Sequence, residues 1–300
     1  MSPPHPRRFR LFSNRMHRPF SLCLVAAVLV ATASFVGCSP TQAGTASPAG
    51  SAPPPVQRAS TSSAAGANAT RIAATTATLS PEIYVAVGDS MTAGQGADDP
   101  ASEAWPVVLS RSLPPGSTFL NLGIGGATVA DATARELPSA LAQHPTLVTV
   151  WLGINDLANV VPVATYEQRL ADLVHRLRAD SAPRLLLANI PPFDHLPAYT
   201  SCLPDPPAGS SPCVLSPQAR ALLPAPGVLN GYLDAYNAAV AEVAEREGAV
   251  LVDVHQAALQ ARSEGREASL VSADGFHPSV AGHRELAAVF AAALGRPGRR

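Results

Sequence analysis

The stretch that decides the fold is IYVAVGDS, residues 83–90, in which a short apolar run ends in Gly-Asp-Ser. A continuous apolar run of this length is typical of a strand that is covered on both faces, as in a parallel sheet. Gly88 allows a tight exit from the strand. Ser90 would then lie at a strand-to-helix turn, where free N–H groups and the positive end of the helix dipole favour a developing oxyanion. Alone the pattern is weak, because Ser90 could equally be only a helix N-cap.

Similar apolar runs alternate with helical patterns along the rest of the chain. The predicted strands are Ile83–Val87, Thr118–Leu122, Leu147–Leu152, Leu185–Asn189 and Val250–Val254. The predicted helices are Glu103–Leu113, Val129–Leu137, Tyr166–Ala179, Leu229–Glu247 and Ser279–Leu294. This alternation predicts an α/β fold in three layers, α/β/α, around a mostly parallel sheet of five strands. In such folds ligands bind at the carboxyl ends of the strands, so the residues that follow each strand carry the functional information.

Three further motifs follow predicted strands or precede the last helix. The sequence NLGIGGAT, residues 121–128, has glycines whose backbone N–H groups could approach a ligand, but Thr128 stands where a dinucleotide fingerprint needs glycine. The sequence GIND, residues 153–156, places the Asn155 amide at a strand end, where it could donate to an oxyanion or only shape the turn. In DGFHP, residues 274–278, the carboxylate of an aspartate could orient the imidazole three residues later. Together these groups supply every part of an acyl-transfer site.

The four motifs in this order resemble the GDSL or SGNH hydrolases, and the resemblance covers roughly residues 82–294. It implies a flavodoxin-like sheet and a serine esterase or lipase. The roles that it implies are Ser90 as nucleophile, His277 as base and Asp274 as the residue that orients His277. It also implies an oxyanion hole made of the Ser90 N–H, the Gly126 N–H and the Asn155 amide. Ala104-Trp105-Pro106 matches another recurrent feature of the bacterial members.

The N-terminus has the pattern of an export signal. Five arginines and no acidic residue precede an apolar run over residues 20–36, and Cys38 follows a small residue. This junction resembles the lipobox of bacterial lipoproteins, which implies cleavage of residues 1–37, lipidation of Cys38 and a membrane anchor outside the cytoplasm. A secreted protein with an ordinary cleavage site and an uncleaved membrane span are the alternatives.

Two other segments lack a pattern that could build a core. Residues 38–80 are almost all Ala, Ser, Thr, Pro and Gly, so they are interpreted as a linker before a hydrolase domain at 81–295. Residues 191–227 are rich in proline and are interpreted as an insertion at the rim of the site. They contain Cys202 and Cys213, for which export favours a disulfide over two free thiols.

Composition excludes several classes of protein. All 21 basic residues are arginine, which excludes a Walker A lysine, a Schiff-base lysine and a Ser-Lys dyad. The formal net charge of −1 argues against a nucleic-acid partner, and no metal-ligand spacing or cofactor motif is present.

The expected substrate is a small-molecule, lipid or glycan ester. A carbohydrate O-acetylesterase and a lipoprotein that binds lipid or glycan without turnover are the alternatives.

The remaining polar residues receive ordinary interpretations. Asp89 and Asp156 are expected to make hydrogen bonds within their turns. Trp151 is expected in the core, and His255 is a weaker candidate for the wall of the site. Surface positions are expected for His144, His175, His195 and His283.

Overall fold

The computed structural model describes residues 80–295 of the chain. The predicted signal segment 1–37, Cys38 and all but the last residue of the predicted linker 38–80 lie outside the described residues. None of the helices in the described range has both the length and the hydropathy needed to cross a membrane.

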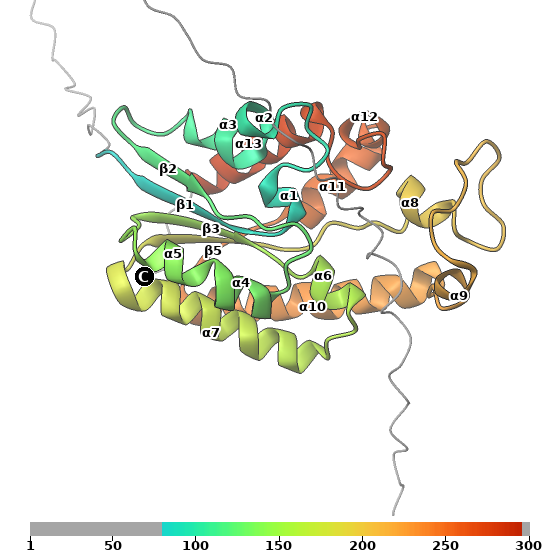
Figure 1. The fold of residues 1–300 in the computed structure, drawn as a ribbon, viewed down its shortest axis with the longest axis horizontal. Coiled ribbons are helices and arrows are strands. Elements are labelled where there is room, and N and C mark those ends of the chain that lie inside the picture. Colours follow the sequence, from blue (N-terminus) through green and yellow to red (C-terminus); the bar gives the residue numbers. More distant parts are fainter. Residues whose placement is uncertain (1–79, 296–300) are drawn as a thin grey trace, which may run out of the picture. The chain divides into compact units, whose positions relative to one another are not determined.

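A five-stranded, entirely parallel sheet forms the centre of the molecule and confirms the predicted fold class (Figure 1). Its spatial order is β2-β1-β3-β4-β5, so β1 lies between β2 and β3. The strands are β1 (Ile83–Gly88), β2 (Thr118–Asn121), β3 (Leu147–Trp151), β4 (Arg184–Ala188) and β5 (Val250–Val252).

The sheet is covered on both faces because successive side chains of each strand point to opposite sides. On β1, Val85 and Val87 join one apolar core, whereas Tyr84 and Ala86 join the other. Figure 1 shows α4 (Val129–Arg135), α5 (Leu137–Leu141), α7 (Val163–Ser181) and α10 (Pro226–Glu247) on one face. The helices α3 (Trp105–Ser110) and α13 (Val280–Leu294) cover the other face. There the Trp105 ring stacks on the Phe290 ring, with the centroids 3.9 Å apart.

Several short helices lie near the carboxyl ends of the strands or in the connecting loops. They are α1 (Ser90–Ala93), α2 (Pro100–Glu103), α6 (Ile154–Ala158), α8 (Pro197–Thr200), α9 (Pro217–Ala221), α11 (Val254–Ser263) and α12 (Glu267–Leu270). The structure corrects the predicted bounds of one helix and one strand. The predicted helix Glu103–Leu113 is broken at Ala104, because Pro106 has no N–H to continue a helix that began earlier. The predicted strand Val250–Val254 ends at Val252, because Asp253 caps α11 by accepting from the Gln256 N–H.

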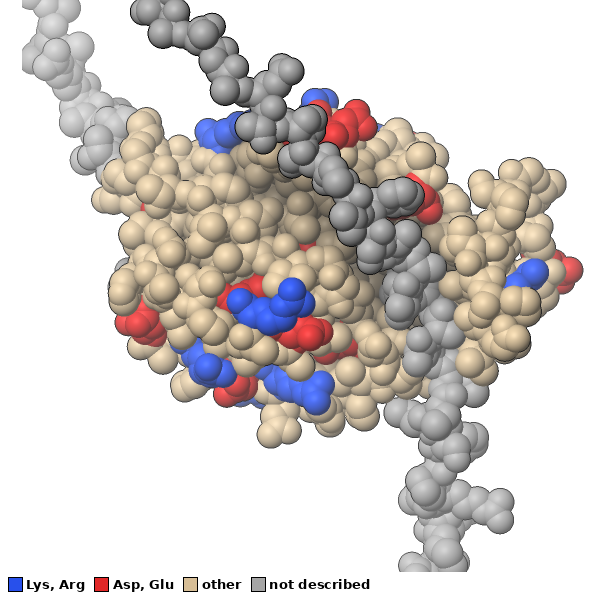
Figure 2. All heavy atoms as spheres, viewed as in Figure 1, with Lys and Arg blue, Asp and Glu red and all other residues tan. Residues whose placement is uncertain are grey.

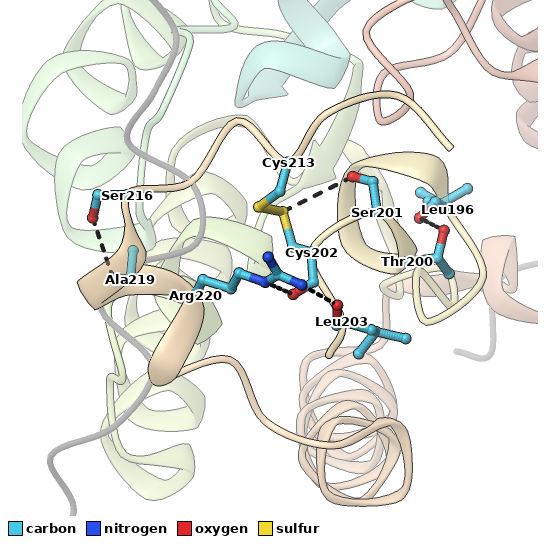
Figure 3. Close-up of a disulfide and its surroundings, with 9 residues drawn as sticks. All are labelled: Leu196, Thr200, Ser201, Cys202, Leu203, Cys213, Ser216, Ala219 and Arg220. Atoms are coloured by element: carbon cyan, nitrogen blue, oxygen red, sulfur yellow. Dashed lines mark hydrogen bonds between the residues drawn. A yellow bond between two sulfur atoms is a disulfide. The ribbon is translucent and has the colours of Figure 1, made fainter. Parts of the chain in front are cut away.

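The proline-rich segment 191–227 contains α8, α9 and the first two residues of α10. Cys202 and Cys213 form a disulfide within it (Figure 3). Arg220 on α9 donates to the backbone carbonyls of Cys202 and Leu203, so the helix is tied to the same loop by a second contact. The segment is therefore held by a covalent bond and by a charged side chain, although it lacks a long helix of its own.

Candidate active site

The Ser90 turn is held by two hydrogen bonds around the end of β1. Ser90 is the first residue of α1, and Asp89 caps this helix by accepting from the Met91 N–H at 2.9 Å. The Gly88 N–H donates to the carboxylate of Glu136 at 2.8 Å. A side chain at position 88 would overlap Thr92, since a Cβ there would lie 2.2 Å from its hydroxyl. The turn therefore requires glycine before Asp-Ser, and its N-cap is Asp89 rather than Ser90.

Ser90, His277 and Asp274 form a continuous chain of hydrogen bonds, although Ser90 and His277 are 187 residues apart in the sequence. The His277 Nε2 lies 3.0 Å from the Ser90 Oγ, and the His277 Nδ1 lies 2.7 Å from the Asp274 Oδ2. Ser90 and His277 are buried, whereas the Asp274 side chain is 42% exposed. One imidazole nitrogen is thus hydrogen-bonded to a hydroxyl and the other to a carboxylate.

Asp274 is held in its ionised form by the groups around it. Partial burial alone would raise its pKa, but the hydrogen bonds from His277, Phe276 and Ser272 outweigh that effect and hold the pKa well below its usual range. The backbone N–H groups of Phe276 and His277 and the hydroxyl of Ser272 all donate to the same Oδ1, at 2.8–2.9 Å. The other oxygen, Oδ2, is left for the imidazole, so the carboxylate can fix the ring orientation and stabilise an imidazolium.

Asn155 lies between the Ser90 turn and the loop that carries Gly126. Its amide donates to the Asp89 Oδ2 at 3.2 Å and to the Ala127 carbonyl at 3.1 Å. Gly126 has a φ of +78°, and a side chain at this position would meet no atom within 4 Å, so the backbone here faces open space. Both hydrogens of the Asn155 amide are engaged, so one of these bonds must open before the amide can donate to a ligand.

Three buried carboxyl groups lie beneath these loops. Burial raises the pKa of Asp89 to about 7, that of Asp156 to about 6 and that of Glu136 to about 8. Asp89 makes the turn contact expected from the sequence. Asp156 instead accepts from the Val129 N–H at 3.0 Å and so connects α6, which follows β3, to the start of α4. The sequence did not identify Glu136, because its partner, the Gly88 N–H, lies 48 residues away.

The other histidines fall into two groups. His144, His175 and His195 are exposed, as expected. His283 was expected at the surface and is fully buried, so that prediction was wrong. Its Nδ1 accepts from the Trp105 N–H, its Nε2 donates to the Gln95 carbonyl, and burial lowers its pKa. Trp105 lies 178 positions away in the sequence, so no local sequence pattern could predict this contact.

Two other expectations concerned residues near the strand ends. The His255 ring lies against Asn237 and the Ile190 carbonyl, and it makes no hydrogen bond to the Ser90 chain. Trp151 is in the core as expected, with its indole N–H donating to the Asn189 carbonyl.

An apolar pocket of about 950 Å³, including the part open to solvent, lies at this end of the sheet. Its wall includes Asp89 and Met91, the sequence neighbours of Ser90. It also includes Phe276 and Pro278, the sequence neighbours of His277. Among the described residues, no group of three or more His, Cys, Asp or Glu side chains is arranged to hold a metal ion.

Comparison with known proteins finds one family and several relatives. A model of the GDSL-like Lipase/Acylhydrolase family matches residues 86–285. The chain is 34% identical to Esterase TesA of Pseudomonas aeruginosa over 122 residues, which is 39% of this chain and 59% of that protein. It is 29% identical to the Bacillus subtilis protein named "Uncharacterized lipoprotein YqeF", over 37% of this chain and 49% of that protein. The chain thus spans about half the length of these curated relatives.

Among solved structures, one similar fold is a mutant of Axe2, an acetyl-xylooligosaccharide esterase from Geobacillus stearothermophilus. The TM-score is 0.52 and the sequence identity 25%, with 74% of this chain and 99% of that chain covered.

Proposed function

The chain belongs to the GDSL-like lipase/acylhydrolase family, and on that basis we propose that it is a serine-dependent carboxylic ester hydrolase that acts outside the cytoplasm. The observation that carries the proposal is the hydrogen-bonded chain from the Ser90 Oγ through His277 to Asp274. This arrangement of hydroxyl, imidazole and carboxylate is the one that activates a serine for acyl transfer.

The proposed reaction has two halves. The Ser90 oxygen attacks the ester carbonyl while the His277 Nε2 takes the hydroxyl proton, an assistance typically worth about 10²–10⁴-fold. The tetrahedral intermediate collapses to an acyl-serine, and His277 returns the proton to the leaving alcohol. Water then attacks the acyl-serine in the same way, which releases the carboxylic acid and restores Ser90. Throughout, Asp274 holds the imidazole in place.

The proposed oxyanion hole uses the backbone N–H groups of Ser90 and Gly126 and the Asn155 amide. Its support is the position of Ser90 at the start of α1, the open space around Gly126 and the two contacts that hold Asn155 between their loops. Donors placed in this way stabilise the charge that develops on the carbonyl oxygen.

Replacement of the nucleophile tests this proposal. Ser90→Ala should abolish hydrolysis of p-nitrophenyl acetate and p-nitrophenyl dodecanoate, while Ser139→Ala, on the exposed side of α5, serves as the matched control and should retain it. Hydrolysis by Ser90→Ala at the wild-type rate would reject the enzyme and favour the non-catalytic binding protein.

A second candidate function is a carbohydrate O-acetylesterase with the same mechanism. The observation that favours it is the similarity of the fold to Axe2, whose title names it as an acetyl-xylooligosaccharide esterase. Release of acetate from acetylated xylan at a higher kcat/KM than from any longer acyl ester would support this candidate.

The proposed location rests on the sequence before the described residues. The lipobox-like junction at Cys38 suggests a lipid anchor, and one relative carries the name of a lipoprotein. In a bacterial host, Cys38→Ala should move the protein from the membrane fraction to the soluble fraction. Continued membrane association of this variant would contradict lipidation at Cys38.

A further inference from the structure

His283, like His277, is a buried histidine, and it lies in the first turn of α13. Its Nδ1 accepts from the Trp105 N–H at 3.3 Å, and its Nε2 lies 3.1 Å from the Gln95 carbonyl oxygen. An imidazole that accepts at Nδ1 and is neutral carries its single proton on Nε2, so His283 donates to Gln95. The proposed reaction uses neither nitrogen of this ring.

Gln95 connects His283 to the turn that carries Ser90. The Gln95 N–H donates to the Ser90 carbonyl at 2.9 Å, while the Gln95 carbonyl accepts from His283. On the other side, the His283 N–H donates to the Ser279 carbonyl at 2.8 Å, and Ser279 follows His277 by two residues in the sequence. Together with the contact of 3.0 Å between the Ser90 Oγ and the His277 Nε2, these bonds form one closed ring.

The loop that carries Gln95 also packs directly against the His277 turn. Gly96 has a φ of +93°, and a Cβ at this position would lie 2.3 Å from the Pro278 carbonyl oxygen and 3.0 Å from the His277 Cβ. Glycine allows both the left-handed backbone and this close approach. Because the loop touches the His277 turn, a shift of the Gln95 carbonyl would change the separation of the two turns.

We infer that His283 is a positioning residue whose bond to the Gln95 carbonyl holds the Ser90 turn within hydrogen-bond distance of His277. The inference rests on the proposed ester hydrolysis. A neutral imidazole suits this place because it supplies one acceptor for a buried N–H and one donor for the loop carbonyl. Loss of the donor would open the ring, and a misplacement of about 1 Å can lower the rate of an enzyme by about 10²-fold.

Two amide variants separate the two hydrogen bonds of His283. In His283→Asn an amide oxygen can take the place of Nδ1, but no atom reaches the place of Nε2, so only the bond from Trp105 can be kept. In His283→Gln the amide nitrogen can take the place of Nε2 and keep the bond to Gln95. With p-nitrophenyl butyrate, kcat should fall roughly 10- to 10²-fold in His283→Asn with KM within threefold, whereas kcat should stay within threefold of wild type in His283→Gln.

Thermal unfolding of the same variants separates positioning from stability. A histidine that only stabilises the fold would lower the Tm of both variants and leave the kcat of the folded enzyme unchanged. If His283→Asn does not fold, His283→Met takes its place, because a flexible apolar chain fills the space without a donor. The control is His175→Asn on α7, whose outer face carries exposed charged side chains (Figure 2), and it should retain full activity.

A kcat within threefold of wild type in the variant without the donor, or an equal fall in His283→Gln, would overturn the inference. Crystal structures of the variants separate it from the proposed function. The Ser90 Oγ and the His277 Nε2 should be beyond hydrogen-bond reach in His283→Asn and about 3.0 Å apart in His283→Gln. If the wild type hydrolyses no ester but this distance changes as expected, the proposed function fails and the positioning role stands. If esters are hydrolysed and both variants keep the wild-type distance, the inference alone fails.

Discussion

The side-chain amide of Asn155 donates to the Oδ2 of Asp89 at 3.2 Å, which connects α6, after β3, to the turn that carries Ser90. The second hydrogen of the amide goes to the Ala127 carbonyl at 3.1 Å, in the loop that carries Gly126. Asn155 thus holds together the three segments proposed to form the oxyanion hole. Donation to an oxyanion would replace one of these two bonds.

Replacing Asn155 should separate transition-state stabilisation from substrate binding. We expect Asn155→Ala to lower kcat by about 10²–10³-fold with a small change in KM, because the donor acts mainly on the charged intermediate. Steady-state kinetics with p-nitrophenyl butyrate measures both constants. Asn230→Ala, which removes an amide that donates to Asp194 in the 191–227 segment, is the control. A kcat for Asn155→Ala within threefold of wild type would exclude Asn155 from the oxyanion hole.

Asp274→Asn should leave the fold intact and remove most of the activity. An amide in place of the carboxylate favours the wrong imidazole tautomer and cannot stabilise the imidazolium, so we expect kcat to fall by about 10⁴-fold. Asp172→Asn, at a largely exposed position on α7, makes the same chemical change away from the site and should be active. A fall of less than tenfold in Asp274→Asn would mean that another group orients His277.

Glu136 should make the protein less stable as the pH rises. Burial raises its pKa to about 8 in the folded state, against about 4.5 for an ordinary glutamate. Between these values the folded protein keeps a proton that the unfolded chain releases, so the free energy of unfolding falls from pH 4.5 to pH 8. The Glu136→Gln variant carries no such proton and should show a shallower fall.

Urea unfolding at pH 5 and pH 8 measures this difference, with each unit of pKa shift worth about 1.4 kcal/mol at full effect. Asp89 and Asp156 contribute with the same sign, since burial raises their pKa to about 7 and about 6. Glu242→Gln, at an exposed position on α10, is the matched control. If Glu136→Gln and Glu242→Gln lose the same stability between the two pH values, the burial argument is wrong.

Removing the disulfide should loosen the 191–227 segment without dismantling the sheet. Cys202 and Cys213 close a loop with a sequence separation of 11, and cross-links of this size typically contribute up to about 3 kcal/mol. A Cys202→Ala/Cys213→Ala variant should be cleaved faster by a nonspecific protease between these positions, and the reduced wild type should behave in the same way. Equal cleavage rates with and without the disulfide would show that the Arg220 contacts alone hold the loop.

The sequence was sufficient to predict the layers of the fold and the residues that meet around Ser90. Buried parallel strands appear as uninterrupted apolar runs, and the chemical groups of the site follow those runs directly. The resemblance to the GDSL hydrolases is confirmed by the family match. Helix boundaries were less certain, because a single proline at 106 and a single capping aspartate at 253 decided where elements end.

The groups that support the site could not be predicted, because each depends on a partner distant in the sequence. Glu136 accepts from Gly88, Asp156 accepts from Val129, and His283 bonds to Trp105 and Gln95. No local spacing encodes these contacts. They arise only from the way the fold brings the strand ends and α13 together.

The proposed nucleophile lies at the end of the first strand, and its imidazole partner lies immediately before the final helix. Every strand crossover must therefore be in place before the reactive pair exists. Hydrolysis should thus report cooperative folding of the whole domain, and a translation product truncated before Asp274 should be inactive however well its first strands assemble.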